Sequence, residues 1–296
     1  MMYQLSLARF IVGLAVLVIA AVSDIKTRRV RDELWYFLGA FAAVILAVDL
    51  YLRGAEVQYY LIFIIIGVLF LEAFIERPAI YEKGKVNFLV VGWLFIPIIV
   101  YSYMFADLKG SSLFWSLSTI PVMMLMAFLF YYLGILYGGA DAKAVLTLGI
   151  LLPFYPVISG ISNYGASAGI IETMQILFPF TFVVLLNSSL ILLVVPLFYF
   201  FYNIKNGDVG FPQMFFGYKK NVSDIPGSFV WPMEYRSGSS WDIELFPRRE
   251  EKEAVKALME SDKKRAWVTP KLPFLVPMLV GYVLSFLIGN PMMHIL

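Results

Sequence analysis

The chain contains no cysteine and a single histidine, His294, close to its C-terminus. Without a thiol, the chain can form no disulfide, no thiolate nucleophile and no thiolate metal site. One terminal histidine also provides neither a His-rich zinc site nor the general base of a Ser/His triad. Acid–base chemistry is therefore left to carboxylates and lysines, and we expect no metal and no cofactor.

Charged side chains are scarce. They make up 15% of the 296 residues, whereas 60% are hydrophobic, and the mean hydropathy is +0.79. These values lie outside the range of soluble domains and predict an all-α polytopic membrane protein in a lipid bilayer. A formal net charge of +2 gives no reason to expect a nucleic-acid partner. The composition leaves the oligomeric state open.

Apolar runs of about 20 residues, long enough to cross a bilayer as helices, indicate about eight transmembrane helices. The runs are approximately 4–23, 34–52, 59–75, 87–106, 113–137, 141–158, 171–203 and 272–290. Pro153 and Pro156 interrupt the sixth run, which is the weakest of the set. The sequence thus predicts a bundle of about seven spans over 1–203, a small mixed cytosolic domain over 204–270, and a final helix and C-terminus over 271–296.

The segment between the last two spans is the one part with soluble composition. Its first half is rich in glycine, proline and aromatic residues, which predicts loops with short strands. Its second half, from Pro247 to Trp267, has the charge pattern of an amphipathic helix.

Basic residues alternate between the loops. Several follow the first, third and seventh spans, whereas the other loops carry one or none. The basic residues of the first two basic loops are Lys26, Arg28, Arg29 and Arg31, and then Arg77, Lys83 and Lys85. Because basic loops stay in the cytosol, we expect both termini outside and these loops inside.

Two aspartates stand at junctions between apolar and polar sequence. Asp24 ends the first span, and Asp141 follows the fifth, so the topology places both at the cytosolic boundary of the membrane. A charged group at such a position is costly and usually functional. Gly138 and Gly139 precede Asp141, and we expect them to form a turn that supports the site and helps it grip an extended peptide.

The sequence around these aspartates resembles the archaeal type IV prepilin and preflagellin peptidases, membrane aspartic proteases of the GxGD class. The resemblance lies in Asp24–Trp35 and Gly138–Gly149, and more loosely in Asp208–Tyr235 and Pro273–Gly281. Ala140 stands where the class name has glycine. The resemblance implies an aspartic endopeptidase that removes a short basic leader peptide from archaellin or type IV pilin-like precursors at the cytosolic face, with Asp24 and Asp141 as catalytic residues.

A pair of carboxylates suits peptide hydrolysis. Two such groups a few ångströms apart do not both ionise cheaply, so they tend to share a proton. One can then activate water while the other polarises the peptide carbonyl. A basic leader also calls for a negative counterpart, and Glu250, Glu251 and Glu253 lie on the predicted cytosolic side.

Two other functions use membrane carboxylates. A presenilin-like intramembrane protease has the same residue pair, but it cuts inside an apolar helix and needs its aspartates in mid-span. A proton- or cation-coupled transporter needs acids near the bilayer midplane, usually with inverted repeats. Since both aspartates stand at span ends, the sequence favours leader removal.

Overall fold

The computed structural model describes residues 2–82, 84–136, 138–156, 158, 168–238, 240–245, 247 and 251–291. The chain forms two compact units. The first contains Met1–Ser188 and Phe274–Leu296, and the second contains Ser189–Pro273.

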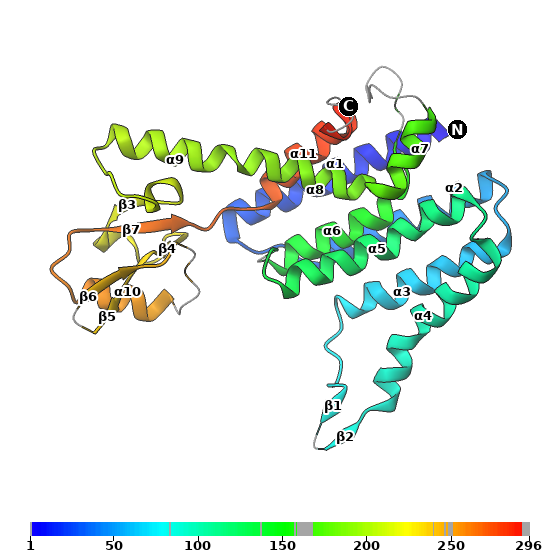
Figure 1. The fold of residues 1–296 in the computed structure, drawn as a ribbon, viewed down its shortest axis with the longest axis horizontal. Coiled ribbons are helices and arrows are strands. Elements are labelled where there is room, and N and C mark those ends of the chain that lie inside the picture. Colours follow the sequence, from blue (N-terminus) through cyan, green and yellow to red (C-terminus); the bar gives the residue numbers. More distant parts are fainter. Residues whose placement is uncertain are drawn as a thin grey trace. The chain divides into compact units, whose positions relative to one another are not determined.

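The described part of the first unit is a helical bundle. Its α-helices are α1 (Met2–Thr27), α2 (Asp32–Leu52), α3 (Ile62–Glu72), α4 (Phe88–Leu108), α5 (Ser112–Tyr132), α6 (Gly139–Leu151), α7 (Ala168–Leu177), α8 (Phe180–Leu192) and α11 (Leu275–Ile288). A 3-10 helix, Val57–Leu61, leads into α3. Two short strands, β1 (Tyr81–Glu82) and β2 (Lys85–Val86), pair antiparallel between α3 and α4 and form a hairpin beyond the ends of those helices (Figure 1).

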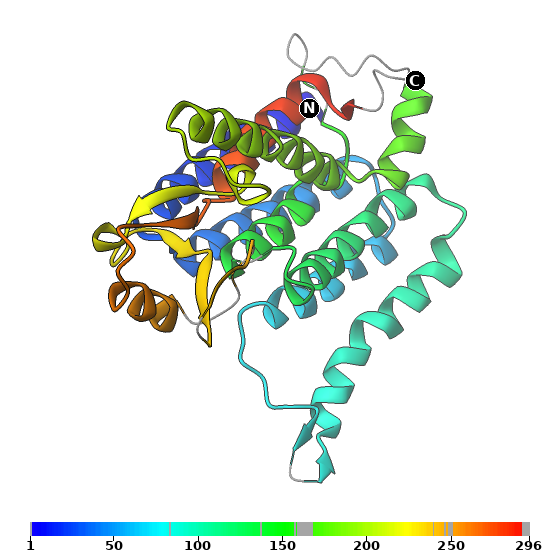
Figure 2. The ribbon, with the colours of Figure 1, turned by 60° about the vertical axis from the view of Figure 1, so that its left-hand side comes forward.

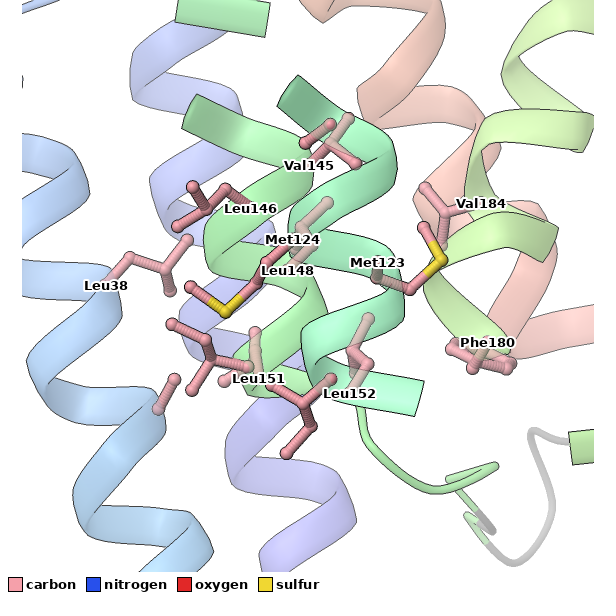
Figure 3. Close-up of a cluster of buried hydrophobic side chains, with 14 of the residues drawn as sticks. Leu38, Met123, Met124, Val145, Leu146, Leu148, Leu151, Leu152, Phe180 and Val184 are labelled. Atoms are coloured by element: carbon pink, nitrogen blue, oxygen red, sulfur yellow. The ribbon is translucent and has the colours of Figure 1, made fainter. Parts of the chain in front are cut away.

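The centre of the bundle is α6. All residues from Ala144 to Leu151 are buried, as expected for a helix that is apolar on every side. It packs against α2 and α5, while α1 packs against α11. Figure 3 shows the side chains around α6, with Leu38 from α2, Met123 and Met124 from α5, and Phe180 and Val184 from α8.

Five helical segments in the described part of the chain are long and apolar enough to cross a membrane. They are Tyr3–Thr27, Asp32–Leu52, Phe88–Leu108, Ser112–Tyr132 and Phe180–Lys205. Val57–Glu72 and Leu275–Ile288 are shorter apolar helices. The polytopic helical fold predicted from the composition is thus confirmed.

Prolines account for the main differences from the predicted spans. The sixth run was expected to be helical to 158, but α6 ends at Leu151, before Pro153. The seventh run is divided into α7, α8 and α9 (Val194–Lys205). Pro179 stands between α7 and α8, and Pro196 follows the break at Leu193. Proline has no N–H for the helical hydrogen bond, so the helices break at or next to these positions.

The second unit combines α9 with a small β-structure (Figure 2). β3 (Tyr218–Asn221), β7 (Arg265–Pro270) and β4 (Val230–Pro232) form an antiparallel sheet with β7 in the middle. β5 (Glu234–Ser237) and β6 (Ser240–Ile243) form a hairpin, and α10 (Glu251–Met259) packs against β5 and β4. The predicted loops and short strands therefore occupy the first half of this segment.

The helix predicted from Pro247 to Trp267 is wrong over its second half. Only Glu251–Met259 is helical, and Arg265–Pro270 forms the central strand of the sheet. Ala266, Trp267 and Val268 are buried there. An aromatic and a β-branched residue suit a strand between two neighbours, and this pairing with β3 and β4 is not visible in the local charge pattern.

Candidate active site

Asp24 lies in the last turn of α1, which ends at Thr27. The Arg28 N–H donates to the Asp24 carbonyl oxygen at 3.0 Å and completes that turn. The hydroxyls of Ser23 and Thr27 then donate to the Arg29 carbonyl oxygen at 2.7 and 3.0 Å. These two bonds redirect the chain toward α2 and fix the position of the turn that carries Asp24.

The Asp24 side chain is half-buried. Its carboxylate interacts electrostatically with Arg28, the residue that follows the helix. The backbone N–H of Leu275, the first residue of α11, lies within hydrogen-bonding reach of the same carboxylate. The last helix of the chain thus contributes to the surroundings of an aspartate near its beginning, a contribution that the sequence did not predict.

Asp141 is the third residue of α6, and Gly138 is the N-cap. A carboxylate at this position can fold back to the N–H of the N-cap residue, and the Gly138 N–H lies within reach of Asp141. The Asp141 side chain is buried, with 9% exposed. A Cβ placed on Gly138 would stand 2.7 Å from Asp141 Oδ2, whereas a Cβ on Gly139 would meet nothing within 4 Å.

The lack of space for a side chain therefore explains why residue 138 is a glycine. Gly138 has φ −97°, and neither it nor Gly139 is among the residues with positive φ, so the backbone there is open to any residue. The carboxylate of Asp141 occupies the volume that a side chain at 138 would need.

The fold brings the two predicted aspartates together. The carboxylate of Asp141 lies within electrostatic range of that of Asp24. One comes from the end of α1 and the other from the beginning of α6, so two helix termini far apart in the sequence meet at one place.

An ion pair links the two segments that contain the aspartates. Lys143 Nζ lies 2.6 Å from Asp32 Oδ1, and Asp32 is the first residue of α2. The same ammonium stands 4.5 Å from the centre of the Phe74 ring. Neither residue was among the predicted site residues. Both lie inside the segments that carry the family resemblance, which was the available signal.

The three predicted acidic residues belong to the second unit. Glu253 is exposed on α10. Glu250 and the side chain of Glu251 lie outside the described residues. In the described part of the chain, no three His, Asp or Glu side chains are placed to hold a metal ion. The chemistry that the geometry offers is that of two neighbouring carboxyl groups, each next to a backbone N–H.

Comparison with known proteins gives matches at both ends of the chain. Residues 11–86 match the type IV leader peptidase family, and residues 210–290 match the archaeal peptidase A24 C-terminus, type II. A preflagellin peptidase of Methanococcus voltae is 26% identical over 71% of this chain and 88% of its own length. Preflagellin peptidases of Methanococcus maripaludis and Methanocaldococcus jannaschii are each 24% identical over 97% of this chain, and over 97% and 96% of their own lengths.

These alignments cover nearly the whole chain, including the small domain and the last helix. They confirm the resemblance that the aspartate motifs predicted, and the chain is a relative of the archaeal preflagellin peptidases.

Proposed function

We propose that this protein is a membrane aspartic endopeptidase that removes the short basic leader from preflagellin or type IV pilin-like precursors. Asp24 and Asp141 are its catalytic carboxylates. The observation that supports the proposal is that the two carboxylates, at the ends of α1 and α6, lie within electrostatic range of each other. The match to the leader peptidase family and to relatives named preflagellin peptidase supports the reaction and the substrate class.

The pair acts through one shared proton. The ionised carboxylate takes a proton from water as the water oxygen bonds to the peptide carbon. The protonated carboxyl group donates to the carbonyl oxygen, which becomes the hydroxyl of a tetrahedral intermediate. The C–N bond then breaks as the leaving nitrogen takes up the proton that came from water, and the hydroxyl formed from the carbonyl oxygen returns its proton to the carboxylate that had donated it, which restores the shared proton. Activity therefore requires one protonated and one ionised aspartate, and kcat/KM falls on both sides of a pH optimum.

The reaction takes place at the cytosolic edge of the membrane. Asp24 is three residues from the end of α1, next to the basic residues Arg28 and Arg29, which the positive-inside rule keeps in the cytosol. The Lys143–Asp32 pair joins the beginnings of α6 and α2, which supports a common face for both aspartates. An edge position suits a cut before the apolar helix of the substrate, and both termini of the chain then lie outside.

Glu250, Glu251 and Glu253, which stand at the start of α10 and just before it in the sequence, provide a counterpart for the basic leader on the cytosolic side. We expect reversal of these three charges to lysine to raise KM for a basic leader at low salt, with kcat retained, because long-range attraction is screened by salt. Asp262→Lys, at an exposed position beyond the helix, is the matched control. An unchanged KM at low salt would exclude this role.

Cleavage of a model substrate tests the whole proposal. Detergent-solubilised protein is incubated with a peptide that carries a basic leader before an apolar helix, and the new N-terminus is sequenced. We expect one cut at the leader boundary, and a loss of about 10²–10⁴-fold in Asp24→Asn and in Asp141→Asn. Asp107→Asn, at an exposed position in α4, should keep full activity. Full activity in either site variant would refute the assignment, and a cut inside the apolar helix would favour the presenilin-like alternative.

A further inference from the structure

The small domain contains a cavity of about 400 Å³ with a strongly basic lining. It lies where β3 and the start of β7 face the β5–β6 hairpin. The cavity is lined by Lys219, Glu234, Trp241, Ile243, Lys263, Lys264, Arg265 and Trp267. Four cations and one carboxylate therefore face the same space.

Two buried carboxylates hold part of this positive charge in place. Asp208 accepts from both terminal nitrogens of Arg265 at 3.0 and 2.6 Å, and it lies 3.7 Å from Lys219 Nζ. Glu234 pairs with Lys263 and also accepts from the backbone N–H of Trp267 at 2.8 Å. Counting both carboxylates, the group still carries two more positive than negative charges.

Lys264 carries part of this excess positive charge. Its side chain is exposed, and no carboxylate in the described part of the chain lies within ion-pair distance of it. The paired cations are held by buried acids, with Asp208 at 5% and Glu234 at 6% exposed. The cavity is thus a fixed cationic site that an anionic ligand can complete.

Apolar surface adjoins the cavity. Lys263 lies 4.2 Å from the centre of the Trp241 ring and Lys219 lies 5.5 Å from that of Trp267, so the ammonium groups stand beside indoles. The loop after Asp208, which pairs with two of the lining cations, exposes further apolar side chains, with Val209 73% and Phe211 82% exposed.

Gly210 holds that loop at the cavity wall. A Cβ on Gly210 would stand 3.0 Å from the Trp267 ring, so the loop packs directly on a residue that lines the cavity. Val209 and Phe211 are thus exposed on either side of a residue that packs on this tryptophan.

We infer that this cavity binds the phosphate of an anionic phospholipid headgroup. Cations beside exposed apolar and indole side chains are the combination that binds the surface of an anionic membrane. Such a membrane surface is close by along the chain, because β7 is followed after residues 271–274 by the apolar helix α11. A soluble phosphorylated molecule carries the same phosphate group, but it offers no apolar chain that could contact the exposed Val209 and Phe211.

Native mass spectrometry of the full-length protein in detergent tests this inference. The protein is titrated with phosphatidylglycerol, with phosphatidylcholine of the same chain length, and with glycerol phosphate. The test variant is Lys264→Glu, whose exposed side chain leaves the buried pairs intact, and Lys264→Gln gives a milder change. The matched control is Lys252→Glu, which reverses an exposed charge on α10.

We expect saturable binding of one phosphatidylglycerol, tighter than that of phosphatidylcholine. Each positive charge near an anionic lipid contributes about fivefold in affinity, so Lys264→Glu should weaken binding by about 25-fold and Lys264→Gln by about fivefold. Lys252→Glu should leave it unchanged. Equal binding of the two lipids, equal losses in Lys264→Glu and Lys252→Glu, or glycerol phosphate binding as tightly as the lipid would overturn the inference.

Discussion

At the scale of single residues, the position of the Asp141 carboxylate depends on the empty space at Gly138. A methyl group there would stand 2.7 Å from Asp141 Oδ2, so Gly138→Ala must displace the carboxylate. A catalytic group moved by about 1 Å can cost about 100-fold in rate. We therefore expect Gly138→Ala to lower kcat by about 100-fold, measured with the basic-leader substrate, while the protein remains folded.

Gly139→Ala is the matched control, because its methyl group would meet nothing within 4 Å. Alanine is also favoured over glycine inside a helix, and Gly139 is the first residue of α6. This variant should retain nearly the wild-type kcat. Equal losses in the two variants would show that the glycines act through the backbone, and that the space beside Asp141 is unimportant.

The sequence singled out the two proposed catalytic residues, but it did not predict their surroundings. Asp24 and Asp141 could be singled out because a carboxylate at a span end is costly and rare. Their neighbours come from distant parts of the chain: Leu275 reaches Asp24 from the last helix, and Asp32 reaches Lys143 across 111 positions. Such contacts depend on how the helices pack, which local pattern does not specify.

At the scale of elements, the Lys143–Asp32 pair connects α6, which carries one aspartate, to the beginning of α2. The side chains are 20% and 47% exposed, so solvent screens the pair and its energetic contribution stays below about 1 kcal/mol. We expect Lys143→Met, which keeps the apolar stem near Phe74, and Asp32→Asn each to lower kcat/KM by up to about fivefold. The double variant should be no worse than either single variant.

A double-mutant cycle on kcat/KM measures this coupling. The control cycle uses Arg31 and Glu33, which pair with each other and have side chains that are 83% and 67% exposed; it should give no coupling. Losses that simply add in the Lys143 and Asp32 cycle would mean that the pair does not position α6.

Helices that a long apolar run marks in the local sequence were predicted well. The runs at 34–52, 87–106 and 113–137 correspond to α2, α4 and α5 within a few residues, because an apolar stretch of that length satisfies its backbone internally as a helix. The end of α6 and the strand β7 were not predicted from the sequence. Pro153 and Pro156 were noted as interruptions, yet the point at which they end a helix depends on the packing around it. The strand Arg265–Pro270 exists through its pairing with β3 and β4, far away in the sequence.

At the scale of the whole molecule, a helical unit carries the aspartates and a second, small unit carries the acidic residues and the basic cavity. The β-structure and α10 of the second unit lie in the sequence between the segment Phe180–Lys205 and α11, so the side of the membrane on which we expect them follows from the same topology that places Asp24 and Asp141. Under that topology, both proposals concern the cytosolic face. The absence of cysteine makes this directly testable, because an introduced cysteine is the sole thiol.

Two single-cysteine variants locate the loops. Gly110→Cys lies between α4 and α5, where a Cβ meets nothing within 4 Å, and Lys252→Cys is exposed on α10. In right-side-out vesicles, we expect a membrane-impermeant maleimide to label Gly110→Cys at once and Lys252→Cys only after permeabilisation, since basic segments remain in the cytosol. The cysteine-free wild type gives the background. Labelling of Lys252→Cys from outside would place the small domain, with its acidic residues and its basic cavity, on the wrong side for a substrate whose leader is still in the cytosol.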